Sequence, residues 1–284
     1  MISLQNPGAD IFVPDGLPVA EAARRITHLA IGAHQDDLEF MAYHGIVTCY
    51  DRPGWSFGGV TCTDGAGSAR QGLYAEKTDE EMRSIRGEEQ RAAARLGRYG
   101  LMVQLGHSTK TLKTAASNPL TPDLMALFSA VSPRVVYTHN PADKHETHLH
   151  VFAAVIEALR SLPAEKRPMR VYGCEVWRGL DWMEDSEKVV HDVSPRPELA
   201  AALNQLFDSQ ISGGKNYGLA TEGRRRANAT YLAAHHVDHV THASYAMDLT
   251  PLVRDAALDP VDYTQGFIER FRSDVSMKLR RALR

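Results

Sequence analysis

The sequence predicts an α/β fold: a mostly parallel sheet with helices on both faces, followed by a smaller C-terminal lobe. Short apolar runs bounded by turn residues recur along the first two thirds of the chain, and each has the length of a buried strand. Segments with helical character separate these runs. Strands and helices that alternate four or five times form βαβ units, and such units place their strands in parallel.

Five strands are expected, at residues 26–32, 56–62, 101–105, 134–139 and 171–176. The clearest helix is expected at 79–96, where Thr78 or Asp79 precedes an alanine-rich, charged segment. Other helices fit residues 38–50, 122–130 and 146–162. In a Rossmann-like sheet of this kind, ligands bind beyond the carboxyl ends of the strands.

The length of 284 residues suits one large domain, and a single domain over residues 1–284 is expected. Its core is expected at about 26–193, and the pattern then changes to an appended lobe at about 194–284. That lobe is expected to hold a helix at 197–210, a basic stretch at 222–226, a histidine cluster ending near His242 and an amphipathic helix with a basic end at 263–284. No internal repeat is visible.

The net charge of -3 and the interspersed charges give no field that would attract nucleic acid or an anionic membrane. Cys49, Cys62 and Cys174 are odd in number and far apart, so buried reduced thiols in a reducing compartment are expected. Residues 1–18 lack the pattern of a signal peptide, and no apolar run is long enough to span a membrane. These features favour a cytoplasmic protein.

The run His34-Gln35-Asp36-Asp37 lies where the first expected strand ends and the next helix begins. Imidazole and carboxylate ligands suit Zn²⁺, and a catalytic zinc site uses three protein ligands and keeps one position open. Neighbouring carboxylates at a turn point in different directions, so one of Asp36 and Asp37 could bind metal while the other transfers a proton. By itself, this run is more simply explained as the acidic first turn of a helix.

A second polar segment follows the fourth expected strand and contains His145 and His148. If a helix begins near Glu146, the spacing of three places both imidazoles on nearly one face, within reach of the same metal and substrate. A single pair of this spacing is more often part of a polar helix cap. Two such segments, each at the carboxyl end of a strand, together indicate a metal site that draws ligands from both.

These two motifs resemble those of the PIG-L/LmbE family of zinc-dependent N-acetylglucosaminyl deacetylases. The family's Ala-His-Pro-Asp-Asp signature stands here as Ala33-His34-Gln35-Asp36-Asp37, and its His-x-x-His signature as His145-Glu146-Thr147-His148. The resemblance covers about residues 26–160 and, more weakly, 171–193. It implies that zinc is held by His34, Asp37 and His148, that Asp36 is the general base and that His145 assists the oxyanion.

The resemblance extends to the loop at 63–68 and to Arg70, which lies where family members have a substrate-contacting arginine. Two positions depart from the family pattern. Gln35 replaces a proline and could hydrogen-bond the substrate, and Thr147 replaces an acidic residue that would support a histidine ligand. Asp143 or Glu146 could supply the missing carboxylate. The candidates for substrate binding are Arg70, Asp143 and Gln35.

The implied activity is zinc-dependent removal of the acetyl group from an N-acetylated amino sugar, with release of acetate. Alternatives are a metal-dependent amidase for a non-sugar N-acyl compound and a non-catalytic sugar-binding protein. A nucleotide-binding protein is disfavoured, because residues 32–36 lack the G-x-G-x-x-G spacing and their carboxylates would repel a pyrophosphate. The resemblance to trimeric and hexameric relatives also suggests a homo-oligomer.

Three further features of the sequence each have more than one interpretation. The cluster His235, His236, His239 and His242 is a rival metal site, a wall of the substrate pocket or a surface cluster. The run Arg224-Arg225-Arg226 could bind a phosphate or carboxylate of the substrate, although a charge run is more often a solvated helix face. Trp177, Trp182 and Tyr217 could stack on a sugar ring or pack in the core.

Overall fold

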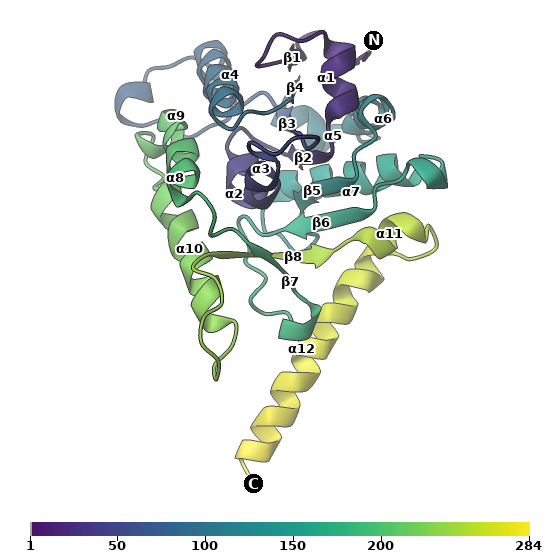
Figure 1. The fold of residues 1–284 in the computed structure, drawn as a ribbon, viewed down its shortest axis with the longest axis vertical. Coiled ribbons are helices and arrows are strands. Elements are labelled where there is room, and N and C mark those ends of the chain that lie inside the picture. Colours follow the sequence, from purple (N-terminus) through teal and green to yellow (C-terminus); the bar gives the residue numbers. More distant parts are fainter. Residues whose placement is uncertain (1) are drawn as a thin grey trace.

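The computed structural model describes residues 2–284. Its elements are arranged around one eight-stranded sheet (Figure 1). The strand order is β1-β4-β3-β2-β5-β6-β8-β7. The five central strands are parallel to one another: β4 (Leu101–His107), β3 (Phe57–Thr63), β2 (His28–Gly32), β5 (Val135–His139) and β6 (Arg170–Cys174). They correspond to the five expected strands, so the predicted α/β class with a mostly parallel sheet is confirmed.

Three antiparallel strands complete the sheet. β1 (Asp10–Phe12) pairs with β4 at one edge, and β8 (Ala243–Asp248) lies between β6 and β7 (Val189–Asp192) at the other. None of these three was expected. Because β8 belongs to the central sheet, the expected lobe at 194–284 shares that sheet with the preceding core.

The direction in which the chain adds strands reverses between β2 and β5. From β2 it builds outward through β3 and β4, then returns to place β5 on the other side of β2 and continues to β6. In open α/β sheets, this switch point opens a crevice beyond the carboxyl ends of the two strands. The segments that follow β2 and β5 therefore face each other across one crevice.

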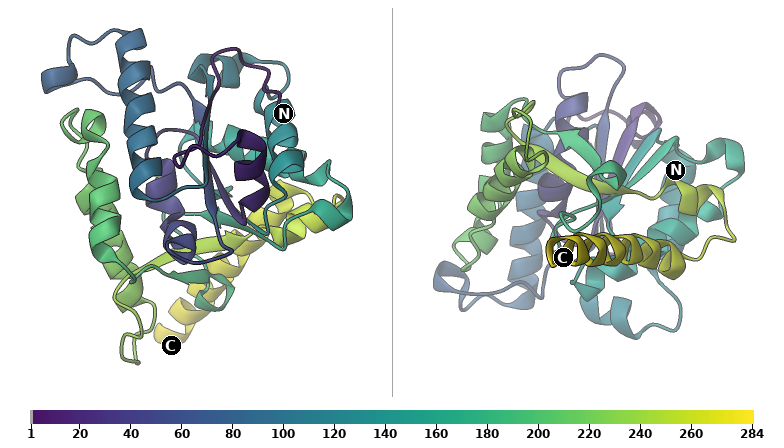
Figure 2. Two further views of the ribbon diagram at one scale, coloured as in Figure 1. Left: turned by 45° about the horizontal axis from the view of Figure 1, so that its top comes forward. Right: turned by 90° about the horizontal axis from the view of Figure 1, so that it is seen from below.

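Helices cover both faces of the sheet (Figure 2). One face is packed by α1 (Val19–Arg25), α6 (Leu120–Val131), α7 (Glu146–Arg160) and α11 (Thr250–Arg254). The other is packed by α2 (Asp37–Met41), α3 (Tyr43–Cys49), α4 (Asp79–Leu96) and α8 (Pro197–Gln205). Side chains alternate between the two cores along each strand: in β2, Leu29 and Ile31 enter the first and Ala30 the second.

Local signals explain the helix boundaries. Thr78 and Glu81 form the reciprocal capping box that starts α4, which matches the expected helix at 79–96. The expected helix at 38–50 is divided into α2 and α3 at Ala42. The expected helix at 197–210 is divided into α8 and α9 (Asp208–Ile211), where Phe207 leaves the helical conformation and is buried against Phe40.

The remaining elements surround this sheet. α10 (Tyr217–Tyr231) carries the basic stretch and stands along one side of the molecule, coloured green in Figure 1. α12 (Pro260–Ala282) packs Phe267 into the first core and then extends beyond the sheet. The short elements are α5 (Thr109–Thr114), η1 (Gly72–Tyr74), η2 (Ala164–Lys166) and η3 (Asp185–Glu187).

All three cysteines are buried free thiols, as expected. Among residues 2–284, no helix combines the length and the apolar character that crossing a membrane requires.

Candidate active site

The loop between β2 and α2 carries the first motif to the crevice. Asp36 adopts a φ of 96°, which is rare for a residue other than glycine, and Asp37 then begins α2. The loop is held from α4: Asp36 N–H donates to Gln90 Oε1 at 3.2 Å, and the Arg86 guanidinium donates to the Gln35 carbonyl. Strained backbone held from outside is common at functional sites.

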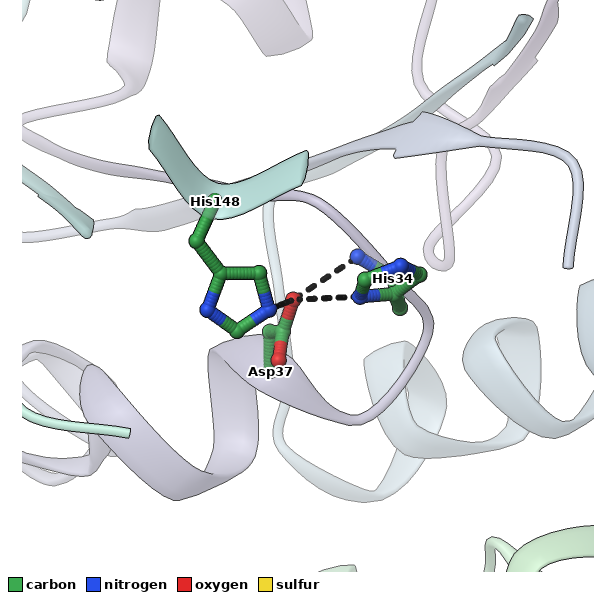
Figure 3. A group of neighbouring side chains, drawn as sticks. All are labelled: His34, Asp37 and His148. Carbon is green, nitrogen blue, oxygen red and sulfur yellow. Dashed lines mark hydrogen bonds and ion pairs between the residues drawn. The ribbon is translucent and has the colours of Figure 1, made fainter. Parts of the chain in front are cut away.

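His34, Asp37 and His148 converge on one point at the crevice (Figure 3). Asp37 Oδ2 lies 3.3 Å from His34 Nδ1 and 3.5 Å from His148 Nε2, and one donor atom from each residue lies within 4.8 Å of the others. Both ring nitrogens of His148 are buried without a hydrogen-bond partner. Two imidazoles and one carboxylate are a donor set of catalytic zinc sites, and the unsatisfied His148 nitrogens fit a metal ligand.

The two aspartates lie in different electrostatic surroundings. Burial opposes ionisation of Asp37, but the nearby His148 imidazole holds the pKa of its carboxyl well below the usual range. Burial raises the pKa of Asp36, while the Arg86 guanidinium, 3.4 Å from Asp36 Oδ2, acts in the opposite direction. Asp37 therefore stays ionised next to the imidazoles, whereas Asp36 is a carboxyl group able to take up a proton.

His145 is the N-cap residue of α7 and lines the cavity beside the candidate ligands. Its ring centroid lies 5.0 Å from that of His34 and 4.5 Å from that of His148. Burial, followed by the neighbouring imidazoles of His148 and His34, lowers the pKa of His145 to about 4. The imidazole is therefore neutral at pH 7 and can donate one hydrogen bond from a ring nitrogen.

A cavity of about 560 Å³ opens beside Asp36 and Asp37. The loop at 65–69 and α10 contribute to its walls, and Trp177, Tyr217 and Phe40 form an aromatic side. The ring centroids of Trp177 and Tyr217 are 6.0 Å apart, and those of Tyr217 and Phe40 are 5.5 Å apart. A larger, more open groove on the other side of Thr63 is not lined by the three candidate ligands.

The three candidates for substrate binding do not line this cavity. The Gln35 amide turns inward and donates to the Thr63 carbonyl at 3.0 Å, and the Arg70 guanidinium donates to Ala66 and Asp79. Asp143 lies behind His148, with Oδ2 3.5 Å from His148 Nδ1. A direct contact of these side chains with substrate therefore stays a prediction.

A carboxylate behind His148 was also expected from Asp143 or Glu146. Asp143 has that position: it is buried, and its oxygens accept hydrogen bonds from His145 N–H at 2.9 Å and Trp177 N–H at 3.1 Å. Glu146 is exposed and pairs with Lys113 instead. Asp143 thus connects the start of α7 with the loop after β6.

Two residues at the site were not expected from the sequence. His139 ends β5, is fully buried and lies with its Nε2 3.4 Å from Asp37 Oδ2. Arg86 is buried in the middle of α4 and lines the cavity. The sequence could have indicated His139 as a site residue, since it is a polar residue at the carboxyl end of an expected strand. Nothing in the sequence distinguishes Arg86 from the other charged residues of α4.

The rival histidine cluster does not form a metal site within residues 2–284. Residues 232–242 form turns and irregular structure in which His235, His236 and His239 are exposed. His242 is buried and its Nε2 lies 3.0 Å from Glu222 Oε1. Of the three aromatic candidates, Trp177 and Tyr217 line the cavity, while Trp182 packs against the first core.

Comparisons with known proteins agree with the motifs and the fold. Residues 29–159 match the profile of the family described as PIG-L, GlcNAc-PI de-N-acetylase. No curated protein is significantly similar to the chain in sequence.

Three solved structures illustrate the shared fold. GalB, the 4-carboxy-2-hydroxymuconate hydratase from Pseudomonas putida KT2440, has a TM-score of 0.61 at 18% identity, over 78% of this chain and 96% of its own. N,N'-diacetylchitobiose deacetylase from Pyrococcus horikoshii has a TM-score of 0.60 at 16% identity, over 78% and 83%. The A40926 pseudoaglycone deacetylase Dbv21 has a TM-score of 0.56 at 16% identity, over 79% and 97%.

Proposed function

Because residues 29–159 form a PIG-L family domain, we propose that this protein is a metal-dependent hydrolase that removes the acetyl group from an N-acetylated amino sugar and releases acetate. The observation that carries the proposal is the convergence of His34, Asp37 and His148 beside Asp36 at the edge of a cavity. A site of this kind contains both the ligands for a metal and a separate group for proton transfer.

Zinc is the ion that this donor set suits best, and His34, Asp37 and His148 would hold it. A bound zinc ion supplies Lewis-acid chemistry, in that it lowers the pKa of water and polarises the acyl carbonyl. Asp143 supports the site from behind, because its carboxylate lies 3.5 Å from His148 Nδ1 and helps to orient the imidazole.

Asp36 is the proposed general base. Arg86 faces its Oδ2, which leaves Oδ1 to accept the proton of the attacking water. The water oxygen bonds to the acetamide carbon, and the neutral His145 donates a hydrogen bond to the carbonyl oxygen as negative charge develops there. The carbon–nitrogen bond then breaks, and Asp36 returns its proton to the leaving amine.

The neighbouring structures support this reaction class and also supply a rival. Two of them are named as deacetylases of a chitobiose or an antibiotic pseudoaglycone, whereas GalB is named as a hydratase. A second candidate function is therefore addition of water to an unsaturated carboxylate, which the cationic side chains lining the cavity favour. The two reactions differ in their products, so an assay distinguishes them.

The test uses the purified zinc-loaded protein with N,N'-diacetylchitobiose and simple N-acetylglucosamine glycosides. We expect acetate and free amine to appear in equal amounts, and a chelator to abolish both. Asp36→Asn should keep zinc and lose about 10²–10⁴-fold in turnover, whereas His148→Ala should lose zinc.

Glu146→Gln is the matched control, because Glu146 lies between the motif histidines but is exposed and directed at Lys113. It should keep both zinc and turnover. Full activity of Asp36→Asn, or loss of a conjugated double bond without acetate release, would overturn the proposed function.

A further inference from the structure

The cavity beside the candidate zinc ligands is lined by more positive charge than the chain as a whole suggests. Six of its side chains are cationic. Arg86 faces Asp36, and Lys113 pairs with Glu146 at 2.7 Å. The other four form no ion pair with any carboxylate in the described part of the chain: they are Lys144, Lys215, Arg224 and Arg225.

Of these four cations, Arg225 gives the strongest indication of a ligand, because it is only 3% exposed and its charge lies inside the protein. Nη2 donates to the Glu39 carbonyl at 2.8 Å and to the Phe40 carbonyl at 3.1 Å, and the guanidinium lies 4.9 Å from the centre of the Tyr43 ring. Nε is buried without a partner. Burial lowers the pKa of Arg225 to about 10, which still leaves it charged at neutral pH.

A purely structural role for Arg225 explains only part of these contacts. The two carbonyls belong to the last turn of α2, whose dipole favours a cation, and the ring of Tyr43 adds a cation–π contact. These interactions hold one edge of the guanidinium. They do not satisfy Nε, and they do not account for three further cations that line the same cavity.

The three other cations lie at the more accessible part of the cavity. Arg224 precedes Arg225 on α10 and donates to the Val176 carbonyl. The Lys215 ammonium lies 5.4 Å from the centre of the Trp177 ring, and Lys144 is exposed next to His145. Arg226, the third arginine of the run, instead points to solvent and pairs with Glu222 at 2.6 Å. The arginine run is thus divided between the cavity and a solvated face.

We propose that the substrate of this site carries an anionic group, a carboxylate or a phosphate, which binds Arg225 together with Arg224 and Lys215. This inference rests on the proposed function, because it places the acetamide at the candidate zinc ligands and the anion further along the aromatic side formed by Trp177, Tyr217 and Phe40. A buried guanidinium with an unpartnered N–H group binds such oxygens by charge-assisted hydrogen bonds. The Glu175 carboxylate also lines the cavity, but it forms no ion pair with Arg225, and its oxygens already accept hydrogen bonds from the Asn228 amide and from the backbone N–H groups of Leu180 and Tyr245.

The first experiment compares three substrates that differ only at the anomeric position: methyl N-acetylglucosaminide, N-acetylglucosamine 1-phosphate and the carboxymethyl glycoside of N-acetylglucosamine. We expect kcat/KM to be at least about tenfold higher for one or both anionic compounds, mainly through KM, and the advantage to shrink as salt is added. The phosphate and carboxymethyl arms show which anion the site prefers.

Variants assign that preference to residues. Arg225→Met should reduce the ratio of anionic to neutral kcat/KM at least about tenfold, and the double variant Arg224→Met/Lys215→Met should reduce it without removing a buried side chain. Arg226→Met is the matched control on the same helix and should leave the ratio unchanged, because Arg226 does not line the cavity. Circular dichroism and zinc content verify that each variant is folded.

Calorimetry separates failure of this inference from failure of the proposed function. Glucosamine 1-phosphate and methyl glucosaminide are titrated into the zinc-loaded protein and into the double variant. If no acetate is released in any assay, the proposed function fails, yet tighter binding of the phosphate that the double variant loses would still support the anion site. If neutral and anionic compounds had equal kcat/KM values and equal affinities, the inference would be overturned.

Discussion

The imidazole of His139 stacks on that of His148, with ring centroids 3.7 Å apart and an angle of 17° between the planes. The Ala33 N–H donates to His139 Nε2 at 2.9 Å, so this nitrogen acts as an acceptor and carries no proton. The 3.4 Å approach of the same nitrogen to Asp37 Oδ2 is therefore a close packing contact and not a hydrogen bond. His139 therefore makes two contacts: it accepts a hydrogen bond from the residue that follows β2, and its ring packs against the face of the candidate ligand His148.

Replacing His139 separates these two effects. His139→Phe keeps a ring against His148 but removes the acceptor for Ala33 N–H, and His139→Gln keeps an acceptor but removes the ring. We expect each to weaken zinc binding about 10–100-fold, as is usual for groups that support a ligand. Competition with a chromogenic chelator measures the affinity. Wild-type affinity in both variants would contradict a positioning role for His139.

Arg86→Met should shift the acid limb of the pH profile. The guanidinium lowers the pKa of Asp36 against the effect of burial, so its removal raises that pKa. Since the proposed base must be ionised, the acid limb of kcat/KM should move to higher pH by about one unit or more, and activity should recover at alkaline pH.

Arg83→Met provides the comparison for this shift. Arg83 lies one turn before Arg86 on α4, is partly exposed and pairs with Asp64 at 2.9 Å and Glu80 at 2.8 Å. Its replacement should leave the limb in place. A limb that stays fixed in Arg86→Met would show that Asp36 is not the group that titrates.

The sequence predicted the parts of the site that depend on local order along the chain. The apolar runs gave all five parallel strands, and parallel strands bring their carboxyl ends to one edge, so His34 and His148 could be expected to meet. The strand β8 was missed because it enters the sheet between β6 and β7, and no local pattern specifies that pairing.

The sequence also did not predict the direction in which individual side chains point. Gln35 lies inside the metal-binding motif, yet its amide turns toward Thr63 and Gln104, away from the cavity. Arg86 lies 50 residues from Asp36, in a helix whose other charges are largely solvated, and only the packing of α4 on the loop after β2 buries it. Contacts of this kind depend on tertiary packing, which periodicity and motif spacing do not describe.

Gly32→Ala should damage the candidate metal site without altering any ligand. A methyl group at Gly32 would lie 2.9 Å from Asp37 Cβ and 3.1 Å from Leu38 Cδ2, so the start of α2 must move. We expect a loss of about 1–3 kcal/mol in the free energy of unfolding and weaker zinc binding. Urea unfolding and chelator competition measure the two effects.

Gly223→Ala is a suitable comparison, because a methyl group there meets no atom within 4 Å. It lies on α10 away from Asp37, so zinc affinity should not change. If Gly32→Ala bound zinc as tightly as the wild type, close packing between β2 and α2 would not be what positions Asp37.

Three histidines beside the second core, of which His28 and His191 are buried and His44 is half-buried, should make the protein acid-sensitive. His44 stacks on His191 with ring centroids 4.2 Å apart and its Nδ1 lies 2.9 Å from Tyr137 Oη, while His28 stacks on Trp55. Burial lowers the pKa of His28 and His44 to about 4, and that of His191 to about 3. In the unfolded chain these groups titrate near 6.5, so between pH 6.5 and 4 the unfolded state binds more protons.

The sign of the effect follows from this difference. The stability that the neutral imidazoles contribute is complete above pH 6.5 and is lost as the pH falls toward 4, by up to about 1.4 kcal/mol per pH unit for each histidine. Urea unfolding between pH 7.5 and 4.5, with a chelator present so that metal release does not contribute, measures the slope. His191→Phe keeps the stack on His44 and should make the slope shallower, whereas His236→Gln in the exposed loop should leave it unchanged. A slope that is the same in His191→Phe and the wild type would show that other groups cause the loss.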